Sequence, residues 1–236
     1  MANVLSIGGR PLSNFDTYYD GSQWFNLPNK EVENISVPGR NGDLTIQGNR
    51  FENISIPFNC YIPKNFRTNY SSLMNYLFSL TGYQRVESNE ETDVYRMGQI
   101  KASVTPNMGQ YGRYGSFPIT IDFQPQKWLK TGETGVTIAS AGTVLTNPTL
   151  FNSKPLLKVQ GTGTIRVNSD TIVLGTNTGE TYIDCEMQDA YEGTINRNSD
   201  ITLSSGAFPV LVPGTNNIDY LGNITSLVVV PRWWRL

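Results

Sequence analysis

Carboxylates gather in one short stretch of the sequence, YIDCEMQD, where Asp184 and Glu186 lie two positions apart and Asp189 follows. On a strand this spacing places the first two side chains on one face. A glycosidase uses two carboxyl groups, one as the general acid and the other as the base or nucleophile. The alternative is that acids at the end of a strand are solvated or hold a turn. We favour that alternative and expect no enzymatic activity.

Histidine is absent from all 236 residues, which removes Ser-His-Asp and Cys-His nucleophilic systems and His-based zinc sites. The sequence also lacks a Cys-x-x-Cys pair, a Walker loop and the oxygen-ligand spacing of an EF-hand. Cys60 and Cys185 lie far apart in apolar strand contexts, so we predict two buried free thiols. No cofactor and no metal is expected.

Sugar binding needs an aromatic platform, for which tryptophan is the best residue. The four tryptophans of the chain are Trp24, Trp128, Trp233 and Trp234. None lies between residues 129 and 232, where a sandwich is expected. The tyrosines that could replace them are Tyr182, Tyr191 and Tyr220, although aromatic residues at alternate strand positions are more often core. A carbohydrate-binding sandwich remains the alternative function.

The stretch ENISVPGRNGDLTI places Pro38, Gly39, Arg40, Asn41 and Gly42 between two segments that alternate polar and apolar residues. Such alternation is typical of half-buried strands, and Pro-Gly and Asn-Gly are turn dipeptides. A phosphate-binding loop would require a helix after the glycines, and a strand pattern follows instead. We predict a hairpin turn whose arginine reaches outward, either to a subunit contact or to water.

The chain carries 16% charged residues and a net charge of −2, so its composition offers no basic surface for nucleic acid. Its first residues, MANVLSIGGRPLSNFD, lack the basic start and the apolar core of a signal peptide. No apolar run approaches the length of a membrane helix. We expect synthesis in the cytoplasm and no membrane partner.

One segment of the chain has a helical pattern: in NFRTNYSSLMNYLFSLTGYQ, apolar residues recur at spacings of three and four. Asn65 or Thr68 is predicted to cap its start, and Gly82 to follow its last turn. Strands predicted around it are NISIPFNCYI, RMGQIKASVTP and SFPITIDFQP. Residues 1–134 therefore predict an α+β domain of antiparallel sheet and one helix.

The second half of the chain changes character after Lys130, where a small, polar stretch to Pro155 suggests an interdomain passage. Short strands follow at regular spacing: PLLKVQG, GTIRVN, DTIVL, ETYIDCE, AFPVLVP, NNIDYLG and ITSLVVVP. We predict a β-sandwich over residues 135–230. Its expected core includes Leu157, Val159, Ile165, Val167, Ile172 and Leu174.

Three stretches, VPGRNGDL ahead of FNCYI, then IDFQPQKWLKTGE, then PRWWRL, together resemble the distal tail protein of siphophage-type bacteriophages. The resemblance spans nearly the whole chain. It implies a mainly β protein with an N-terminal domain related to tail-tube proteins and a C-terminal galectin-like β-sandwich. It also implies a virion structural protein that forms a homohexamer at the tail tip, or baseplate.

In this family the ring joins the tail tube to the host-adsorption apparatus, and its partners are the tube protein and a tip protein that carries receptor-binding or lytic functions. DNA passes through the ring channel without specific binding. By resemblance, Pro38 to Gly42 mark the belt hairpin, and Gln124 to Glu133, with Trp128, mark the exit from the belt. The last segment, 231–236, contains Pro231, Arg232, Trp233 and Trp234. From its residues we infer either an anchor to a partner or a seal of the core.

Overall fold

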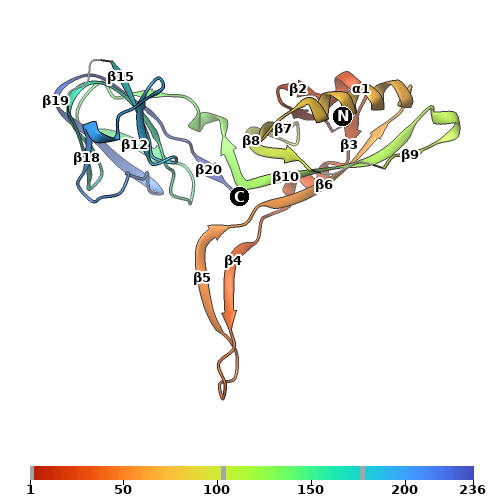
Figure 1. Cartoon of the computed structure of the whole chain (residues 1–236), viewed down its shortest axis with the longest axis horizontal. Helices are drawn as coiled ribbons and strands as arrows, with labels where there is room; N and C mark the ends of the chain where they lie inside the picture. Colours follow the sequence, from red (N-terminus) through yellow and green to blue (C-terminus); the bar gives the residue numbers. More distant parts are fainter. Residues whose placement is uncertain (1–2, 102–104, 176–178) are drawn as a thin grey trace. The chain divides into compact units, whose positions relative to one another are not determined.

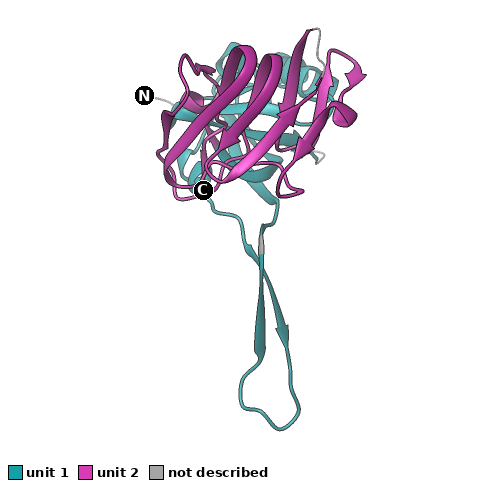
Figure 2. Cartoon of the chain, turned by 90° about the vertical axis from the view of Figure 1, so that its left-hand side faces the viewer, with its two compact units in different colours: residues 1–127, 236 teal, residues 128–235 magenta. Residues whose placement is uncertain are grey.

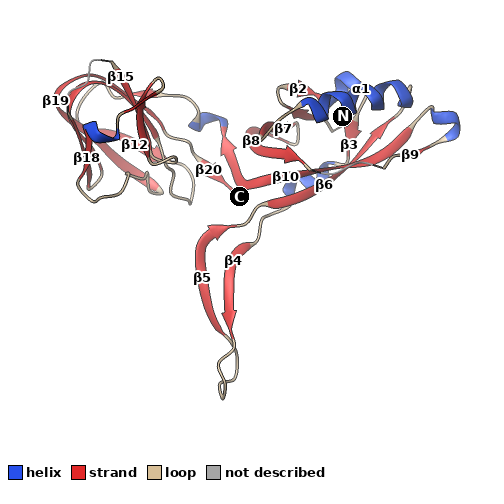
Figure 3. Ribbon diagram, viewed as in Figure 1, coloured by secondary structure: helices blue, strands red, loops and turns tan. Residues whose placement is uncertain are grey.

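The computed structural model describes residues 3–101, 105–175 and 179–236. The chain divides into two compact units, residues 1–127 with 236 and residues 128–235 (Figure 2). This border lies inside the segment Gln124 to Glu133, whereas composition places the domain border after Thr134. Strands dominate both units (Figure 3). The described residues contain one α-helix besides short 3-10 turns, so the mainly β fold expected from the sequence is confirmed.

Unit 1 is built on an antiparallel sheet with the strand order β2-β1-β7-β8-β10-β6-β3, and β9 pairs with the start of β10 (Figure 1). Its strands are β1 (Leu5–Ile7), β2 (Arg10–Pro11), β3 (Tyr18–Tyr19), β6 (Ile54–Ile62), β7 (Gln84–Ser88), β8 (Glu91–Ile100), β9 (Asn107–Met108) and β10 (Gly115–Leu129). Two further strands, β4 (Lys30–Ile35) and β5 (Leu44–Phe51), form a separate two-stranded sheet.

The helix α1 (Phe66–Ser79) forms where the apolar spacing predicts it, and its buried residues Phe66, Leu73 and Leu77 face the core. The predicted cap is wrong. Asn65 stands before the first turn, but its backbone is left-handed and its side chain makes no capping hydrogen bond. A capping side chain needs an extended backbone at that position. The carbonyl of Arg113 accepts the Phe66 N–H at 3.2 Å instead.

The core of unit 1 is rich in aromatic rings. Phe58 lies edge-on to both Tyr19 and Phe123, at 5.5 and 5.9 Å between ring centroids. Cys60 is buried among them, and burial raises the pKa of its thiol to about 12. Cys185 in unit 2 is also buried and free, and burial again raises the pKa to about 12. Both thiols are therefore protonated and unreactive at neutral pH, as buried free cysteines should be.

Unit 2 is an antiparallel β domain whose strands surround one apolar core, and the six predicted core residues all belong to it. The strand order is β11-β19-β13-β15-β16-β17, with β12 on β19, β14 on β13 and β18 on β14. The strands are β11 (Val136–Thr137), β12 (Thr143–Asn147), β13 (Leu156–Val167), β14 (Asp170–Leu174), β15 (Glu180–Asp184), β16 (Asp189–Glu192), β17 (Ile195–Asn196), β18 (Ile201–Leu203), β19 (Gly214–Val230) and β20 (Trp234–Arg235).

Four of the predictions for unit 2 are wrong. PLLKVQG and GTIRVN form one strand, β13, and NNIDYLG and ITSLVVVP form one strand, β19, because the glycines between them bend the strands without ending them. The expected interdomain passage contains β11 and β12, which pair with β19. AFPVLVP contributes an isolated bridge between Leu211 and Ser153 in place of a strand.

The bend in β13 and β19 organises unit 2. The register shifts between Gln160 and Gly161, and β13 pairs with β15 before this point and with β14 after it. Gly161 has φ 103, and a Cβ there would lie 2.1 Å from the carbonyl oxygen of Asn223. A bend of this kind lets one strand serve two layers of a sandwich.

We predict that Gly161→Ala destabilises unit 2 strongly, because the new methyl group collides with the backbone of β19. The matched control is Gly142→Ala, where φ is 77 but nothing lies within 4 Å of the new Cβ. The free energy of unfolding of the control should fall by about 1–2 kcal/mol, the cost of placing an alanine in a left-handed conformation. In Gly161→Ala it should fall by about 1–3 kcal/mol more. Urea unfolding of both variants measures the difference, and equal losses would refute a steric role for the bend.

Candidate assembly interface

The strands β4 and β5 form a hairpin, here called the arm, that pairs with no other strand among the described residues (Figures 1 and 2). The predicted turn is confirmed at its tip. Gly39 and Gly42 have φ 81 and 83, and the Arg40 N–H donates to the carbonyl of Val37 at 3.1 Å. Arg40 itself is exposed.

The strand register gives the arm one apolar face and one polar face. Ile35 lies opposite Leu44 and Glu33 opposite Ile46, so these four side chains share a face. The alternate pairs, Asn34 with Thr45 and Val32 with Gln47, lie on the other face. The polar face holds its own contacts, since Thr45 Oγ1 donates to Asn34 Oδ1 at 3.0 Å and Lys30 Nζ donates to Gln47 Oε1 at 3.2 Å.

The prediction that these strands are half-buried is wrong. All of β4 is exposed, and on the apolar face Ile35, Leu44 and Ile46 are 38%, 42% and 48% exposed. Alternation of polar and apolar residues describes an amphipathic strand, but it does not say whether the covering surface belongs to the same chain. Here no described part of the chain covers the face.

Such an arm is unfavourable for an isolated molecule. A two-stranded hairpin alone is marginally stable in water, and unpaired strand edges invite pairing with another chain. Fully burying one Val, Leu or Ile side chain contributes about 1.5–3 kcal/mol. Because the apolar residues of the arm are already partly covered, each would contribute on the order of 1 kcal/mol on binding. The arm therefore has the properties of an interface element.

The first strand of the arm is fixed at its root by a buried cluster. Trp24 is fully buried, and its indole N–H donates to Glu91 Oε2 at 2.9 Å. Lys127 Nζ pairs with the same carboxylate oxygen at 2.8 Å. Arg96 lies over the Trp24 ring at 5.4 Å and donates through Nη2 to the carbonyl of Asn26 at 2.9 Å. These contacts hold the chain just before β4.

Arg96 is the unusual member of this cluster, because it is fully buried. Burial lowers the pKa of its guanidinium to about 10, and the charge of Glu91 opposes this shift. The group is therefore still charged at neutral pH. Its Nε and Nη1 have no hydrogen-bond partner in the described part of the chain. The guanidinium carbon lies 5.4 Å from the centroids of the Trp24 and Phe123 rings, so cation–π contacts stabilise the buried charge.

The second strand of the arm is fixed by a polar cluster where β6 begins. Asp122 on β10 accepts hydrogen bonds from Ser55 Oγ at 2.8 Å and Asn53 Nδ2 at 3.4 Å, and pairs with Lys101 at 3.0 Å. Burial raises the pKa of Asp122, but the hydrogen bonds from Lys101, Ser55 and Asn53 outweigh it and hold the pKa below its usual range. The chain is thus anchored just before β4 and just after β5.

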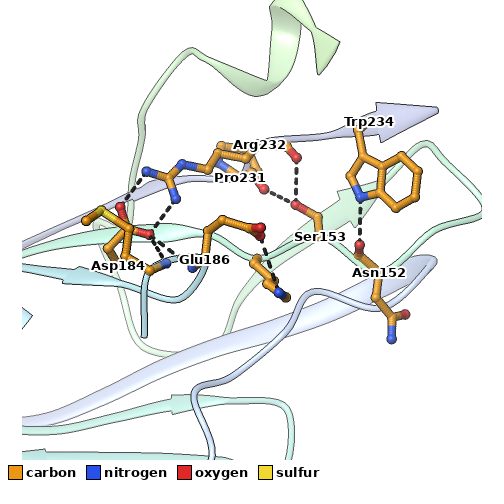
Figure 4. A network of polar contacts seen from close by, with 9 residues as sticks. Asn152, Ser153, Asp184, Glu186, Pro231, Arg232 and Trp234 are labelled. Atoms are coloured by element: carbon orange, nitrogen blue, oxygen red, sulfur yellow. Dashed lines mark hydrogen bonds and ion pairs between the residues drawn. The ribbon is translucent and has the colours of Figure 1, made fainter. Parts of the chain in front are cut away.

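The C-terminal segment, the other region singled out by sequence, packs on unit 2 (Figure 4). Trp233 belongs to the core cluster, and the ring of Trp234 stacks on Phe151 with centroids 4.3 Å apart. Trp234 Nε1 donates to the carbonyl of Asn152 at 2.9 Å. The carbonyl of Pro231 accepts a hydrogen bond from Ser153 Oγ. Of the two interpretations left open by sequence, these contacts support a seal of the core.

Trp128 lies half-buried on β10, and its indole N–H has no partner in the described ranges. The neighbouring Leu129 N–H donates to the carbonyl of Trp233 at 2.8 Å. The motif residues at the end of β10 and at the end of the chain are therefore brought together within unit 2. The tip residues Pro38 to Gly42 belong to the arm in unit 1.

The acidic residues that could have served a glycosidase are engaged in structural contacts. Asp184 accepts both guanidinium hydrogen bonds of Arg232 at 2.7 Å, and the backbone N–H groups of Glu186 and Met187 at 3.0 Å (Figure 4). Burial raises the pKa of Asp184, but these bonds hold it below its usual range. An ionised, saturated carboxylate holds a turn, as the favoured alternative predicts, and offers no proton to a leaving group.

The two other acids are engaged as well: Glu186 pairs with Lys154 at 3.5 Å, and Asp189 accepts hydrogen bonds from Asn196 and Asn198. Among the described residues, no three His, Cys, Asp or Glu side chains are grouped so that they could hold a metal ion. No helix in those ranges is long and apolar enough to cross a bilayer.

The tyrosines proposed as a sugar platform divide into two kinds. Tyr220 packs against the core of unit 2, as expected. Tyr182 and Tyr191 lie outside the core, which corrects that expectation, and their rings stack on each other at 5.5 Å with an interplanar angle of 6°. Lys158 Nζ lies 5.6 Å from the centre of the Tyr182 ring. The ring of Tyr182 is therefore flanked by Tyr191 and Lys158.

No protein-family model matches the sequence, and no curated protein matches it. Solved structures share the fold. The crystal structure of SPP1 Dit, described as a paradigm of the hub adsorption apparatus in phages that infect Gram-positive bacteria, matches with TM-score 0.73 and 13% identity over 100% of both chains. The phage P2 baseplate in its activated conformation matches with TM-scores 0.53 in the Ca structure and 0.54 in the Sr structure, each with 12% identity over 97% of both chains.

We predict that Asp184→Asn lowers the free energy of unfolding by about 1–3 kcal/mol, because it leaves the Arg232 charge without its partner. The matched control is Glu186→Gln, whose ion pair with Lys154 is nearly half exposed on both sides and should contribute less than about 0.5 kcal/mol. Chemical unfolding at pH 7 compares the two variants, and similar losses would contradict the assignment.

The same ion pair makes a prediction for pH. The folded-state pKa of Asp184 is lower than its unfolded value, so its stabilisation is present above the unfolded pKa and is lost as pH falls through the folded pKa. The difference in stability between wild type and Asp184→Asn should therefore be constant from pH 7 to about pH 5 and shrink below about pH 4. A difference that grows on acidification would rule out this linkage.

Proposed function

We propose that this chain is a structural subunit of a phage tail tip and forms a hexameric ring that joins the tail tube to the host-adsorption apparatus. The observation that carries the proposal is the arm: an anchored hairpin with an exposed apolar face and two open edges. The fold shared with a phage hub protein and phage baseplates supports this context. The number of copies, six, comes from the resemblance to distal tail proteins.

A projecting arm with an exposed apolar face is suited to forming a closed ring. One element projects from a subunit and needs a different surface on its partner, so the contact is head-to-tail, and such contacts generate rings when the rotation closes. The proposed partners beside further copies are the tube protein on one side and a tip protein on the other. The proposed location is the tail tip of the virion, after synthesis in the host cytoplasm.

The proposed role includes no catalysis. The carboxylates considered for it, Asp184 and Glu186, are held by Arg232, Lys154 and backbone N–H groups. The alternative role, sugar binding by unit 2, is less well supported because Tyr182 and Tyr191 stack on one another. Docking of neighbouring tail proteins is therefore the role proposed for unit 2.

We predict that replacing Ile35, Leu44 and Ile46 together with Ser prevents ring assembly while leaving the fold of the monomer unchanged, because the three side chains make an exposed face. The matched control changes the polar face of the same strands, Thr45→Ser with Gln47→Ser. Native mass spectrometry of purified protein and of dissociated tails measures the oligomer, and unfolding curves check stability. Rings of normal abundance in the triple variant would refute the assignment of the arm as the interface.

A further inference from the structure

Unit 1 carries a second unpartnered surface, at the end of β6 and the start of β10. A cavity of about 580 Å³ opens there, here called the tyrosine groove, and it is lined by Tyr61, Pro63, Asn107, Gly109, Tyr114 and Ser116. Tyr61 and Ser116 are directly opposite each other in the strand register, so they share one face of the sheet. Tyr61 and Tyr114 are 44% and 53% exposed.

The loop between β9 and β10 extends this surface. Met108 is 53% exposed and Tyr111 is 91% exposed, with a left-handed backbone (φ 53) that is unusual for a tyrosine. The loop is nonetheless held firmly, since the Gly109 N–H donates to the carbonyl of Tyr114 at 2.9 Å and the Gly112 N–H to that of Gly109 at 2.9 Å. Tyrosine, methionine and arginine are the residues enriched where proteins bind proteins, and a rigid exposed tyrosine is a typical anchor.

Cations border the tyrosine groove. An adjoining cavity of about 470 Å³ shares Pro63 and Tyr114 with it and is lined by Lys64 and Arg113. The apolar face of the arm carries the opposite charge. Glu33 lies on that face opposite Ile46, and the side chain of Glu31 lies against Gly48 on the same side. An apolar face with two acids thus corresponds to an aromatic groove bordered by Arg113 and by Lys64, which pairs with Asp16 at 3.7 Å.

The positions of these surfaces exclude contact within one chain. The arm leaves unit 1 at the Ile54 end of β6 (Figure 1). The groove includes Tyr61 and Ile62, at the other end of the same nine-residue strand. At roughly 3.3 Å per residue the two ends are about 26 Å apart along the strand. Two complementary surfaces at opposite ends of one unit are what a head-to-tail ring requires.

We propose that the apolar face of the arm of one copy docks into the tyrosine groove of the next copy. This inference rests on the proposed ring and names the receiving surface. Ile35, Leu44 and Ile46 contact Tyr61, Tyr111 and Tyr114 of the neighbouring copy, and Glu33 pairs with its Lys64 or Arg113. The other unpartnered surfaces of the chain, including Phe78 and Leu150, take no part in this contact.

Disulfide trapping tests the proposal on the full chain. The double variant Ile35→Cys with Tyr114→Cys should give a ladder of disulfide-linked oligomers on mild oxidation, and each single variant should remain monomeric on a denaturing gel. The native thiols do not compete, because Cys60 and Cys185 are buried and their pKa values are raised. The matched control, Asn34→Cys with Tyr114→Cys, places the arm thiol on the opposite face and should give at least tenfold less cross-linking.

A second variant measures the groove without cysteines. Tyr111→Asn removes the exposed ring, and asparagine tolerates the left-handed backbone. It should weaken assembly at least tenfold in native mass spectrometry and leave the unfolding curve unchanged. Leu150→Asn, which removes another highly exposed apolar side chain, should leave both assembly and the unfolding curve unchanged.

The outcomes separate the two proposals. Rings in which the arm thiol cross-links no better to Tyr114→Cys than to Phe78→Cys would overturn the groove and leave the ring standing. Absence of rings both in solution and in isolated tails would overturn the proposed function together with the groove. A ladder specific to Ile35→Cys with Tyr114→Cys, joined with weakened assembly of Tyr111→Asn, supports the contact.

Discussion

A two-stranded sheet with one apolar face and two open edges is not at its lowest free energy in water, and this constraint explains much of unit 1. The arm keeps Ile35, Leu44 and Ile46 in solvent although each would gain by burial. Their exposure makes sense if the free energy of covering them is released on assembly.

The elements around the arm are arranged to hold it in place. Charged groups with little exposure lie at its two roots: Arg96, Glu91 and Lys127 at the first strand, and Asp122, which pairs with the exposed Lys101, at the second. Buried ionic groups contribute little net stability but fix geometry, because a shifted partner would leave a buried charge unpaired. We infer that these charges fix the direction in which the arm leaves unit 1. The arm is then preorganised and loses little conformational entropy when it binds a neighbouring copy.

Sequence patterns predicted what depends on local periodicity. The helix at 66–79, the hairpin turn at Pro38 to Gly42 and the core of unit 2 follow from apolar spacing and turn residues. Patterns could not show whether an amphipathic strand is covered, since alternation in β4 and β5 looks the same with or without a partner. Glycines were misleading in unit 2: the pattern predicted a strand end near Gly161, but this residue bends a continuous strand.

The clusters that position the interface were missed for a related reason. Arg96 and Trp24 are far apart in sequence, and Tyr61 and Tyr114 meet only through the pairing of β6 with β10. The one local signal was the run Tyr111-Gly112-Arg113-Tyr114, an aromatic turn with no helical or strand period. Contacts that depend on the register of distant strands require the fold.

A cryo-electron microscopy reconstruction of the tail that contains this chain tests the proposed ring. We expect six copies around the tail axis at the tip, with each arm resting on the neighbouring copy and its apolar face covered. A reconstruction that places the chain away from the tip, shows no rotational symmetry, or leaves the arm in solvent would contradict the proposal.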